Sequence, residues 1–280
     1  MPEEQEQPSP ERPGMTAADY EEFKRRILEL TGLDLSSYKQ RQMQRRINSL
    51  MESLKVPTYR QYFQLLQADP VRYEEFLKRI TINVSEFFRN PERFADLEQK
   101  YLPQLLAKRR PLKVWSAGCS TGPEPYSLAI LLLDLAPGLP HRVLATDIDK
   151  AVLEKAKAGV YQASELKNVS PARLARYFDQ VGEAYRVKDE VKAIVDIRRH
   201  NLLTDPFDRN FDLILCRNVV IYFTEDAKHL LYQKFYQALA PGGFFLVGGT
   251  EPILRYREYG YEAIGPTFYR RPETTAAGGR

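Results

Sequence analysis

One stretch of the sequence carries the residues best suited to holding a charged small molecule. Residues 114–127 read V-W-S-A-G-C-S-T-G-P-E-P-Y-S, a short apolar run, a turn with Gly118 and Gly122, and the start of an apolar helix. Glycine lets the backbone approach a ligand closely, and a helix start presents unpaired N–H groups and a positive dipole end. The stretch therefore predicts a site for a nucleotide-like or carboxylate-bearing cofactor. Its spacing is not G-x-G-x-x-G, so a dinucleotide is not the first expectation.

An acid at the end of the next expected strand supports this prediction. Residues 142–145 form an apolar strand that leads into Asp147 and Asp149. An acid at the carboxyl end of the neighbouring strand is where a ribose diol is bound in such strand-helix-strand units. The alternative is a unit in which Asp147 or Asp149 only caps the following helix and no ligand binds.

The elements that would position these residues form two regions. From about Thr16 to Thr81 the apolar residues recur at helical spacing, which predicts a module of four helices. Beyond Asn83 strands and helices alternate, with a helix that opens at Thr224 and closes at Pro241, and a terminal hairpin. The strands are expected at 112–117, 142–147, 193–199, 211–216 and 243–248. This order predicts an α/β fold with a mostly parallel, Rossmann-like sheet, preceded by a small all-α domain.

Composition excludes several classes of protein. The 280 residues include 41 basic and 37 acidic side chains, and the formal charge of +4 is too small to indicate a nucleic-acid binder. The sequence has no membrane-length apolar run and no signal-peptide pattern at its start, so we expect a cytoplasmic protein. Only Cys119 and Cys216 occur, both near the ends of expected strands, and we expect neither a disulfide nor a metal site.

Five motifs in order resemble one family, the chemotaxis receptor methyltransferases, which transfer methyl groups from S-adenosylmethionine to protein glutamates. The motifs are N-V-S-E-F-F-R at 83–89, W-S-A-G-C-S-T-G-P-E-P-Y-S at 115–127, A-T-D-I-D at 145–149, H-N-L-L at 200–203 and C-R-N-V-V-I-Y-F at 216–223. Two residues depart from the family pattern: Ser85 stands where Thr is usual, and Pro123 where Glu is usual. Glu124 is then the sole acid of that turn.

The resemblance implies a role for each matching residue. Asp147 would hold the ribose hydroxyls of S-adenosylmethionine, and Asn201 and Leu202 would meet the adenine. The methionine end of the cofactor would be enclosed by residues of the linker and of the sheet edge: Asn83, Ser85, Arg89, Gly118, Glu124, Arg217 and Asn218.

The resemblance also implies two catalytic residues. Tyr222 would face the methyl group and the incoming carboxylate, and Arg89 would stabilise that carboxylate in its ionised form. A glutamate has an ordinary pKa of about 4.3 and is ionised at neutral pH, so the reaction needs no general base. Alignment of the reacting groups can supply roughly 7–11 kcal/mol. The products would be a glutamate methyl ester and S-adenosylhomocysteine.

Most of these polar residues also have a purely structural interpretation. Asn83 and Ser85 are ordinary turn and capping residues, Arg89 suits a surface, and Tyr222 suits a core edge. The pair Arg217-Asn218 is harder to explain in this way, because it follows a buried strand at the edge where the glycine turn also ends.

A basic helix predicts a partner surface. Arg41 and Arg45 lie one turn apart on the polar face of the second expected helix, with Arg46 at the flank. Such clusters usually form a solvated helix face. The resemblance implies instead that they bind the acidic cytoplasmic helical region of a chemotaxis receptor. We do not expect tethering of a receptor C-terminal pentapeptide, because the turn at 179–184 is short.

With this resemblance, the chain divides into five expected segments. They are a disordered tail at 1–14, a helical domain at 15–82, a linker at 83–95 that contributes to the cofactor site, a methyltransferase domain at 96–272 with an inserted subdomain at about 160–191, and a disordered tail at 273–280. We expect a monomer that does not insert into the membrane.

Two other functions remain open from the residues. Asn218 and Tyr222 beside a cofactor are compatible with a nucleic-acid methyltransferase, but R-N-V-V-I-Y lacks the prolines of the N-P-P-Y type motifs that suit a flipped base. The chain could also be a module that binds the cofactor without catalysis. Methyl transfer to a receptor distinguishes these alternatives from the enzyme.

Overall fold

The computed structural model describes residues 14–81 and 85–273, and each of these two ranges belongs to a separate compact unit. The expected residue Asn83 and most of both expected tails lie outside the described residues. Gly14, at the end of the first expected tail, accepts a hydrogen bond from the Tyr59 N–H at 3.2 Å. Glu273, at the start of the second, pairs with Lys108. No helix of the described residues is long and apolar enough to cross a membrane.

The first unit is the four-helix module that the periodicity predicts. Its elements are α1 (Ala17–Thr31), η1 (Leu35–Ser37), α2 (Gln40–Ser53), α3 (Tyr59–Ala68) and α4 (Pro70–Thr81). Thr16 and Asp19 form a capping box at the start of α1, and Gly32 ends it with a φ of 73°. Its core is aromatic: the Phe23 and Tyr62 rings stack with centroids 5.9 Å apart. The buried stripe of α2 consists of Met43, Ile47 and Met51.

The second unit is built on a seven-stranded sheet of order β6-β2-β1-β7-β8-β10-β9. The strands are β1 (Lys113–Ala117), β2 (Arg142–Asp147), β6 (Val195–Arg199), β7 (Phe211–Cys216), β8 (Leu239–Val247), β9 (Glu262–Ala263) and β10 (Phe268–Arg270). The first five are parallel, and β10 is antiparallel to both its neighbours. The predicted mostly parallel sheet with a terminal hairpin is thus confirmed.

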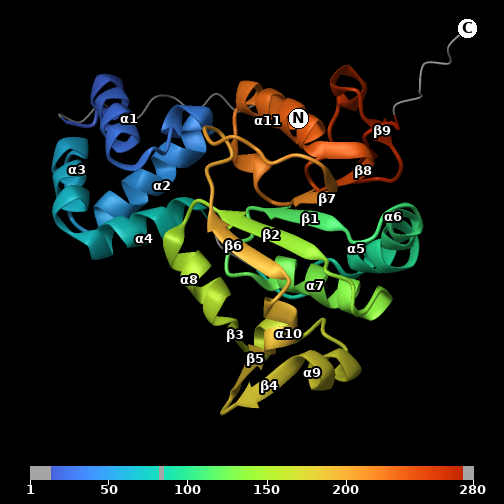
Figure 1. Ribbon diagram of the computed structural model, residues 1–280. Helices are drawn as coiled ribbons and strands as arrows, with labels where there is room; N and C mark the ends of the chain where they lie inside the picture. The colour runs from blue at the N-terminus through green and yellow to red at the C-terminus, as the bar shows by residue number, and fades with distance from the viewer. Residues whose placement is uncertain (1–13, 82–84, 274–280) are drawn as a thin grey trace, which may run out of the picture. The chain divides into compact units, whose positions relative to one another are not determined.

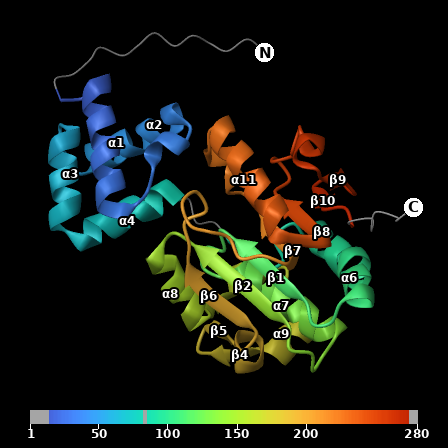
Figure 2. The ribbon, with the colours of Figure 1, turned by 45° about the horizontal axis from the view of Figure 1, so that its top comes forward.

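Helices cover both faces of this sheet. They are α5 (Pro91–Asp96), the π-helical segment η2 (Leu97–Tyr101), α6 (Leu102–Lys108), α7 (Pro123–Leu135), α8 (Lys150–Ala158) and α11 (Glu225–Ala238). Helices α7 and α11 lie on opposite faces (Figures 1 and 2). On the α11 face Trp115 stacks on Phe211, with centroids 5.2 Å apart, and contacts Phe235. On the α7 face, buried residues of α7 and of the strands pack in one apolar cluster.

The edge strand β6 is short and charged. Asp196 and Arg198 are exposed on it and form an ion pair with each other. Its start at Val195, rather than at 193, follows from the short helix α10 (Asp189–Lys192), which is capped by Ala193.

The inserted segment folds into a small antiparallel sheet of its own, of order β3-β5-β4. Its elements are β3 (Val160–Gln162), η3 (Ala163–Leu166), α9 (Pro171–Tyr177), β4 (Phe178–Val181) and β5 (Ala184–Val187). The inserted subdomain expected at about 160–191 thus has the short helix α9, a hairpin that turns at Gly182, and β3 as its third strand. Val181 pairs with Ala184, so the hairpin turn has only Gly182 and Glu183.

The predicted end of the last long helix is wrong. Helix α11 ends at Ala238, and β8 begins at Leu239, well before the expected 243. The Pro-Gly-Gly sequence lies inside this strand, where its register with β7 shifts. A Cβ on Gly243 would lie 2.9 Å from the carbonyl oxygens of Ala240 and Phe211. The glycine therefore permits a close approach of two strands, rather than ending a helix.

Candidate functional site

The glycine turn after β1 is held at the carboxyl edge of the sheet. The N–H groups of Gly118 and Cys119 both donate to the carbonyl oxygen of Thr146, at 2.8 and 2.9 Å. Gly118 and Gly122 have φ values of 82° and 98°, which other residues rarely adopt. Gly122 then caps α7, with Pro123 in the first helical turn. The strand, glycine turn and helix predicted from the sequence are therefore confirmed as local structure.

Asp147 lies at the end of β2, beside this turn. Its Oδ2 accepts the Ser120 N–H at 2.9 Å, and its Oδ1 accepts the Asp149 N–H at 3.1 Å. Burial raises the pKa of the Asp147 carboxyl, while these two N–H groups oppose that shift. The Ile148 N–H also lowers this pKa. Because a carboxylate has about four acceptor sites, Asp147 can still accept a further hydrogen bond from a ligand. The capping role belongs to Asp149, whose Oδ1 accepts the Ala151 N–H at 2.9 Å at the start of α8.

Asn201 and Leu202 lie in the loop that follows β6, and both are buried. The side chain of Asn201 accepts the Leu203 N–H at 3.0 Å. The His200 N–H donates to the Asp147 carbonyl at 2.9 Å, which joins this loop to the end of β2. The expected residues for the ribose and the adenine are thus close along one edge of the sheet.

Lys234 of α11 stabilises the same loop and was not found from the sequence. Its Nζ donates to the carbonyl oxygens of Leu202 at 2.7 Å and Asp205 at 3.0 Å. It also lies 4.1 Å from the centre of the Phe207 ring. Burial lowers the pKa of this amine. A lysine in the middle of an amphipathic helix gives no sequence signal for such a role.

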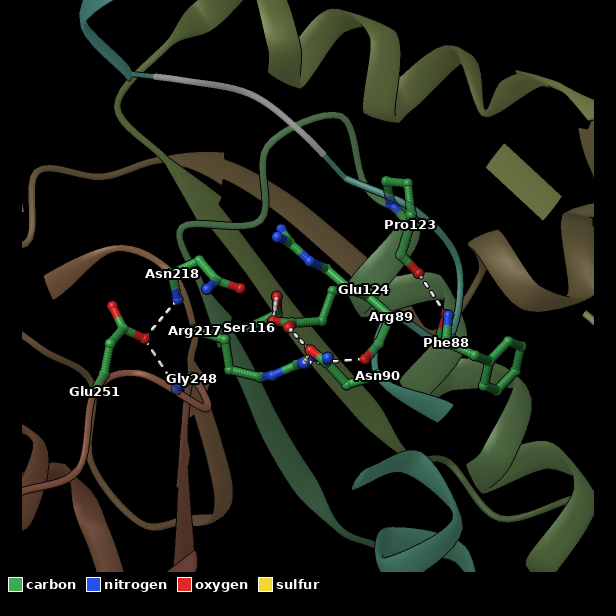
Figure 3. A network of polar contacts seen from close by, with 11 residues as sticks. Phe88, Arg89, Asn90, Ser116, Pro123, Glu124, Arg217, Asn218, Gly248 and Glu251 are labelled. Carbon is green, nitrogen blue, oxygen red and sulfur yellow. Dashed lines mark hydrogen bonds and ion pairs between the residues drawn. The ribbon is translucent and has the colours of Figure 1, made fainter. Parts of the chain in front are cut away.

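A buried ion pair joins β7 to the start of α7. The Arg217 guanidinium lies 3.2 Å from Oε2 of Glu124, whose Oε1 accepts the Ser116 hydroxyl at 2.8 Å. Nη2 of Arg217 donates to the Arg89 carbonyl at 2.9 Å and to Oδ1 of Asn90 at 2.6 Å. Figure 3 shows these contacts converging on Arg217. The Arg89 carbonyl belongs to this network, whereas the Arg89 side chain points away from it. The Arg217 side chain is 3% exposed.

The segment before α5 reaches this ion pair because a serine inside α7 anchors it. The Ser127 hydroxyl donates to the Pro123 carbonyl at 2.7 Å and accepts the Phe88 N–H at 2.9 Å. Phe88 and Asn90 have φ values of 49° and 58°, so the chain turns sharply on either side of Arg89. Ser85, earlier in the segment, is half-buried.

The turn after β7 carries Asn218 and Tyr222. Asn218 has a φ of 59°, and Tyr222 is half-buried at the end of the 3-10 helix η4 (Val220–Tyr222). The buried Glu251, which follows β8, accepts the N–H groups of Asn218 at 2.6 Å and Ile221 at 3.1 Å. Glu251 was not found from the sequence, because no local pattern marks it.

The remaining expected residues belong to the helical unit. Arg41 and Arg45 are exposed on α2. Arg46 is half-buried, and its guanidinium donates to the Ile80 carbonyl of α4 at 2.8 Å. Arg46 therefore also stabilises the contact between two helices.

Two family models match the chain. CheR methyltransferase, all-alpha domain, matches residues 18–81, and CheR methyltransferase, SAM binding domain, matches residues 83–265.

The curated relatives agree with these models. The chain is 43% identical to the chemotaxis protein methyltransferase of Listeria monocytogenes, with 90% of this chain and 96% of that one aligned. It is 42% identical to the protein of the same name from Listeria innocua, over 90% and 96% of the two chains. It is 35% identical to a probable chemotaxis protein methyltransferase of Rhizobium etli, over 85% and 94%. The chain therefore belongs to the CheR methyltransferase family and is a methyltransferase that uses S-adenosylmethionine.

Proposed function

We propose that this methyltransferase esterifies glutamate side chains of chemotaxis receptors, giving glutamate methyl esters and S-adenosylhomocysteine. Methylation of chemotaxis receptors is the function of its family, and the chain aligns with the three relatives described above over 94–96% of their length. The observation that carries the proposal is the convergence of Asp147, the glycine turn and the Arg217–Glu124 pair at one sheet edge.

The ribose and adenine fit the residues at the ends of β2 and β6. Asp147 accepts the Ser120 and Asp149 N–H groups and keeps acceptor capacity for a ribose hydroxyl. Leu202 offers an apolar side chain and Asn201 an amide beside it. We propose that these three residues hold the nucleoside part of S-adenosylmethionine.

The methionine end fits the polar network around Arg217. Nε of Arg217 is buried and has no hydrogen-bond partner within the described part of the chain. A buried donor without a partner is costly, which favours a polar ligand group nearby. We propose that Arg217, Glu124, Asn218 and Gly118 line this end, and that the linker at 83–95 covers it through Ser85 and Arg89. Asn83, which lies outside the described residues, is proposed for the same cover.

Catalysis in this proposal rests on orientation. When bound, the cofactor supplies a methyl group attached to a positively charged sulfur. The Tyr222 hydroxyl orients the acceptor glutamate, and the Arg89 cation stabilises the ionised carboxylate. The chain needs no general base, because a glutamate is already ionised at neutral pH.

We further propose that the basic face of α2 binds the acidic helical region of the receptor. Arg45 and Arg46 line a groove together with Lys78 and Arg79 of α4, and Arg41 lies exposed one turn away on α2. Four cations around one groove attract an acidic surface and raise the rate of encounter. Because Arg46 also binds the Ile80 carbonyl, Arg41 and Arg45 are the better residues for testing this contact.

The wider properties of the protein are also proposals. The two-residue turn between β4 and β5 is short, which argues against tethering of a receptor tail by this hairpin. We propose a cytoplasmic monomer that meets receptors without inserting into the membrane.

Transfer of radiolabelled methyl groups to receptor-containing membranes tests the proposed function. We expect label on the receptor that is released by mild base, as an ester is. Label that appears only on added DNA or RNA would favour a nucleic-acid methyltransferase. Binding of S-adenosylhomocysteine without any transfer would favour a non-catalytic module.

A further inference from the structure

The turn after β7 is organised around one buried carboxylate. Glu251 is 5% exposed and follows β8 by four residues. Its Oε2 accepts the N–H groups of Asn218 at 2.6 Å and Gly248 at 2.9 Å, and its Oε1 accepts the Ile221 N–H at 3.1 Å. Figure 3 shows Glu251 reaching across to Asn218 from the neighbouring segment. Three converging backbone N–H groups form a concave anion site, and the chain fills it with its own side chain.

The backbone around this carboxylate is shaped to admit it. A Cβ on Gly248 would lie 2.1 Å from Oε2 of Glu251 and 3.0 Å from the Asn218 nitrogen. A side chain at position 248 would therefore displace the carboxylate. Asn218 has a φ of 59°, in the left-handed region that residues other than glycine adopt rarely and that asparagine tolerates better than most. Such a conformation persists where the surroundings fix it, and the N–H···O bond to Glu251 does so.

The charge of Glu251 is balanced by these dipoles. Among residues 14–81 and 85–273, no cation forms an ion pair with it. Burial raises the pKa of the Glu251 carboxyl, and the backbone N–H groups oppose that shift. A glutamine in its place has one acceptor oxygen, and its NH₂ group would point at an N–H donor.

We propose that Glu251 is a positioning residue for the acceptor side of the site. The turn that it holds begins just after Arg217 and ends just before Tyr222, the residues proposed above for the cofactor and the acceptor. Loss of the carboxylate frees the Asn218 and Ile221 N–H groups, and the turn that sets the position of the Tyr222 ring loosens. This inference rests on the proposed role of Tyr222.

The test compares Glu251→Gln with wild type by two measurements. Hydrogen exchange, followed by mass spectrometry on a peptide spanning 217–223, should be at least tenfold faster in E251Q. The kcat for receptor methylation should fall at least 30-fold, while the Kd for S-adenosylhomocysteine rises less than threefold. Glu251→Asp keeps both carboxylate oxygens but is one methylene shorter. The kcat of this variant should lie between those of wild type and E251Q.

A matched control separates positioning from general stability. Asp212 is also 5% exposed and lies at the opposite end of β7. It accepts the Lys113 N–H at 2.8 Å and, unlike Glu251, also pairs with a cation, Arg109, at 2.9 Å. Asp212→Asn should lower the melting temperature but keep kcat within threefold of wild type, at a temperature where both are folded. If E251Q does not fold, Gly248→Ala, which displaces the carboxylate, provides the same test.

Two results would overturn the proposal. The first is hydrogen exchange at 217–223 that is unchanged in E251Q. The second is a kcat that falls no further in E251Q than in D212N. If even the wild-type protein does not methylate receptors, the proposed function fails, but the exchange measurement still decides whether Glu251 holds the turn.

Discussion

Two effects act in opposite directions on the Asp147 carboxylate: hydrogen bonds stabilise its charge, and burial destabilises it. Its carboxylate is held by two backbone N–H groups at the end of β2, and the same burial that places it there raises its pKa. A carboxylate in this position can bind a ligand, but it has lost much of its hydration by water. Single substitutions at Asp147 should therefore separate cofactor binding from folding.

The first prediction concerns the affinity of Asp147→Asn for the cofactor. An uncharged amide has one acceptor oxygen, and a charge-assisted hydrogen bond contributes about 1.5–3 kcal/mol. Isothermal titration calorimetry with S-adenosylhomocysteine should show a Kd about 10- to 100-fold above that of wild type. Asp196→Asn, an exposed change on the neighbouring edge strand, should leave the Kd unchanged. An unaltered Kd in D147N would remove the ribose assignment.

The second prediction concerns the pH dependence of stability in the same variant. The pKa of Asp147 is raised in the folded state above its ordinary value of 3.8, so the folded state binds its proton more tightly than the unfolded state does. Wild type therefore loses stability relative to D147N as the pH rises from about 4 through the raised pKa. Urea unfolding measures the free energy of unfolding of both proteins between pH 4 and 7. The value for D147N minus the value for wild type should increase as the pH rises. A difference that moves in favour of wild type would contradict the raised pKa.

The third prediction concerns Tyr222→Phe. The change removes one hydroxyl proposed to orient the acceptor, and a lost hydrogen bond to a charged group corresponds to roughly a 10- to 100-fold fall in turnover. Single-turnover methylation should decrease by this factor, whereas the Kd for S-adenosylhomocysteine should stay within threefold. Tyr185→Phe, a half-buried tyrosine of the inserted sheet, is the control. Equal turnover in Y222F and wild type would exclude the role.

Among the elements, the connection between β1 and α7 is the most constrained by its surroundings. A Cβ on Gly122 would lie 2.8 Å from the Tyr161 hydroxyl and 2.9 Å from the Cβ of Ala156. The turn is thus packed against α8 and β3 as well as held in a left-handed conformation. It has no room to adapt to a side chain at this position.

The fourth prediction uses this constraint. Gly122→Ala should lower the free energy of unfolding by about 2 kcal/mol or more, because it adds a steric clash to an unfavourable φ. Gly138→Ala is the matched control: its φ is 78°, but no atom lies within 4 Å of the added Cβ. The difference between the two variants in urea unfolding measures the clash alone. Equal losses would show that the turn can move.

The elements also show which features a sequence can predict. The run Phe211–Cys216 is apolar at every interior position except Asp212, and it was predicted with correct ends. The end of α11 was not, because Pro-Gly-Gly signals a helix end and a strand irregularity equally well. Glu251 could not be found either, since its partners Asn218 and Ile221 lie 33 and 30 positions away. Contacts at that separation depend on strand order, which local patterns do not specify.

Across the whole molecule, the two units divide the work of the proposed enzyme. The sheet unit carries the residues proposed for the cofactor, and the helical unit carries a groove lined by Arg45, Arg46, Lys78 and Arg79. Charge on a surface acts mainly on the rate of encounter with a partner, and this action weakens with salt. Recognition of the receptor and methyl transfer should therefore be separable by mutation.

The fifth prediction tests this separation with Arg41→Ala and Arg45→Ala combined. The receptor KM should rise several-fold in low salt, while the cofactor Kd is unchanged. The difference from wild type should shrink as salt is raised beyond 0.15 M, where charges are screened over about 8 Å. Arg25→Ala with Arg60→Ala removes the same charge from exposed positions of α1 and α3. A receptor KM that is equal in both double variants and in wild type would leave α2 with a structural role only.

The charged edge strand β6 has a consequence for how the protein behaves at high concentration. One side of β6 is paired with β2, and its other side ends the sheet. An open edge of this kind can recruit a strand from a second copy and start aggregation. The exposed Asp196 and Arg198 oppose such pairing, because a strand added beside β6 would bury or crowd their charges. Within residues 14–81 and 85–273 the β6 edge of the sheet is therefore unpaired, and its charges oppose the addition of a strand from a second copy.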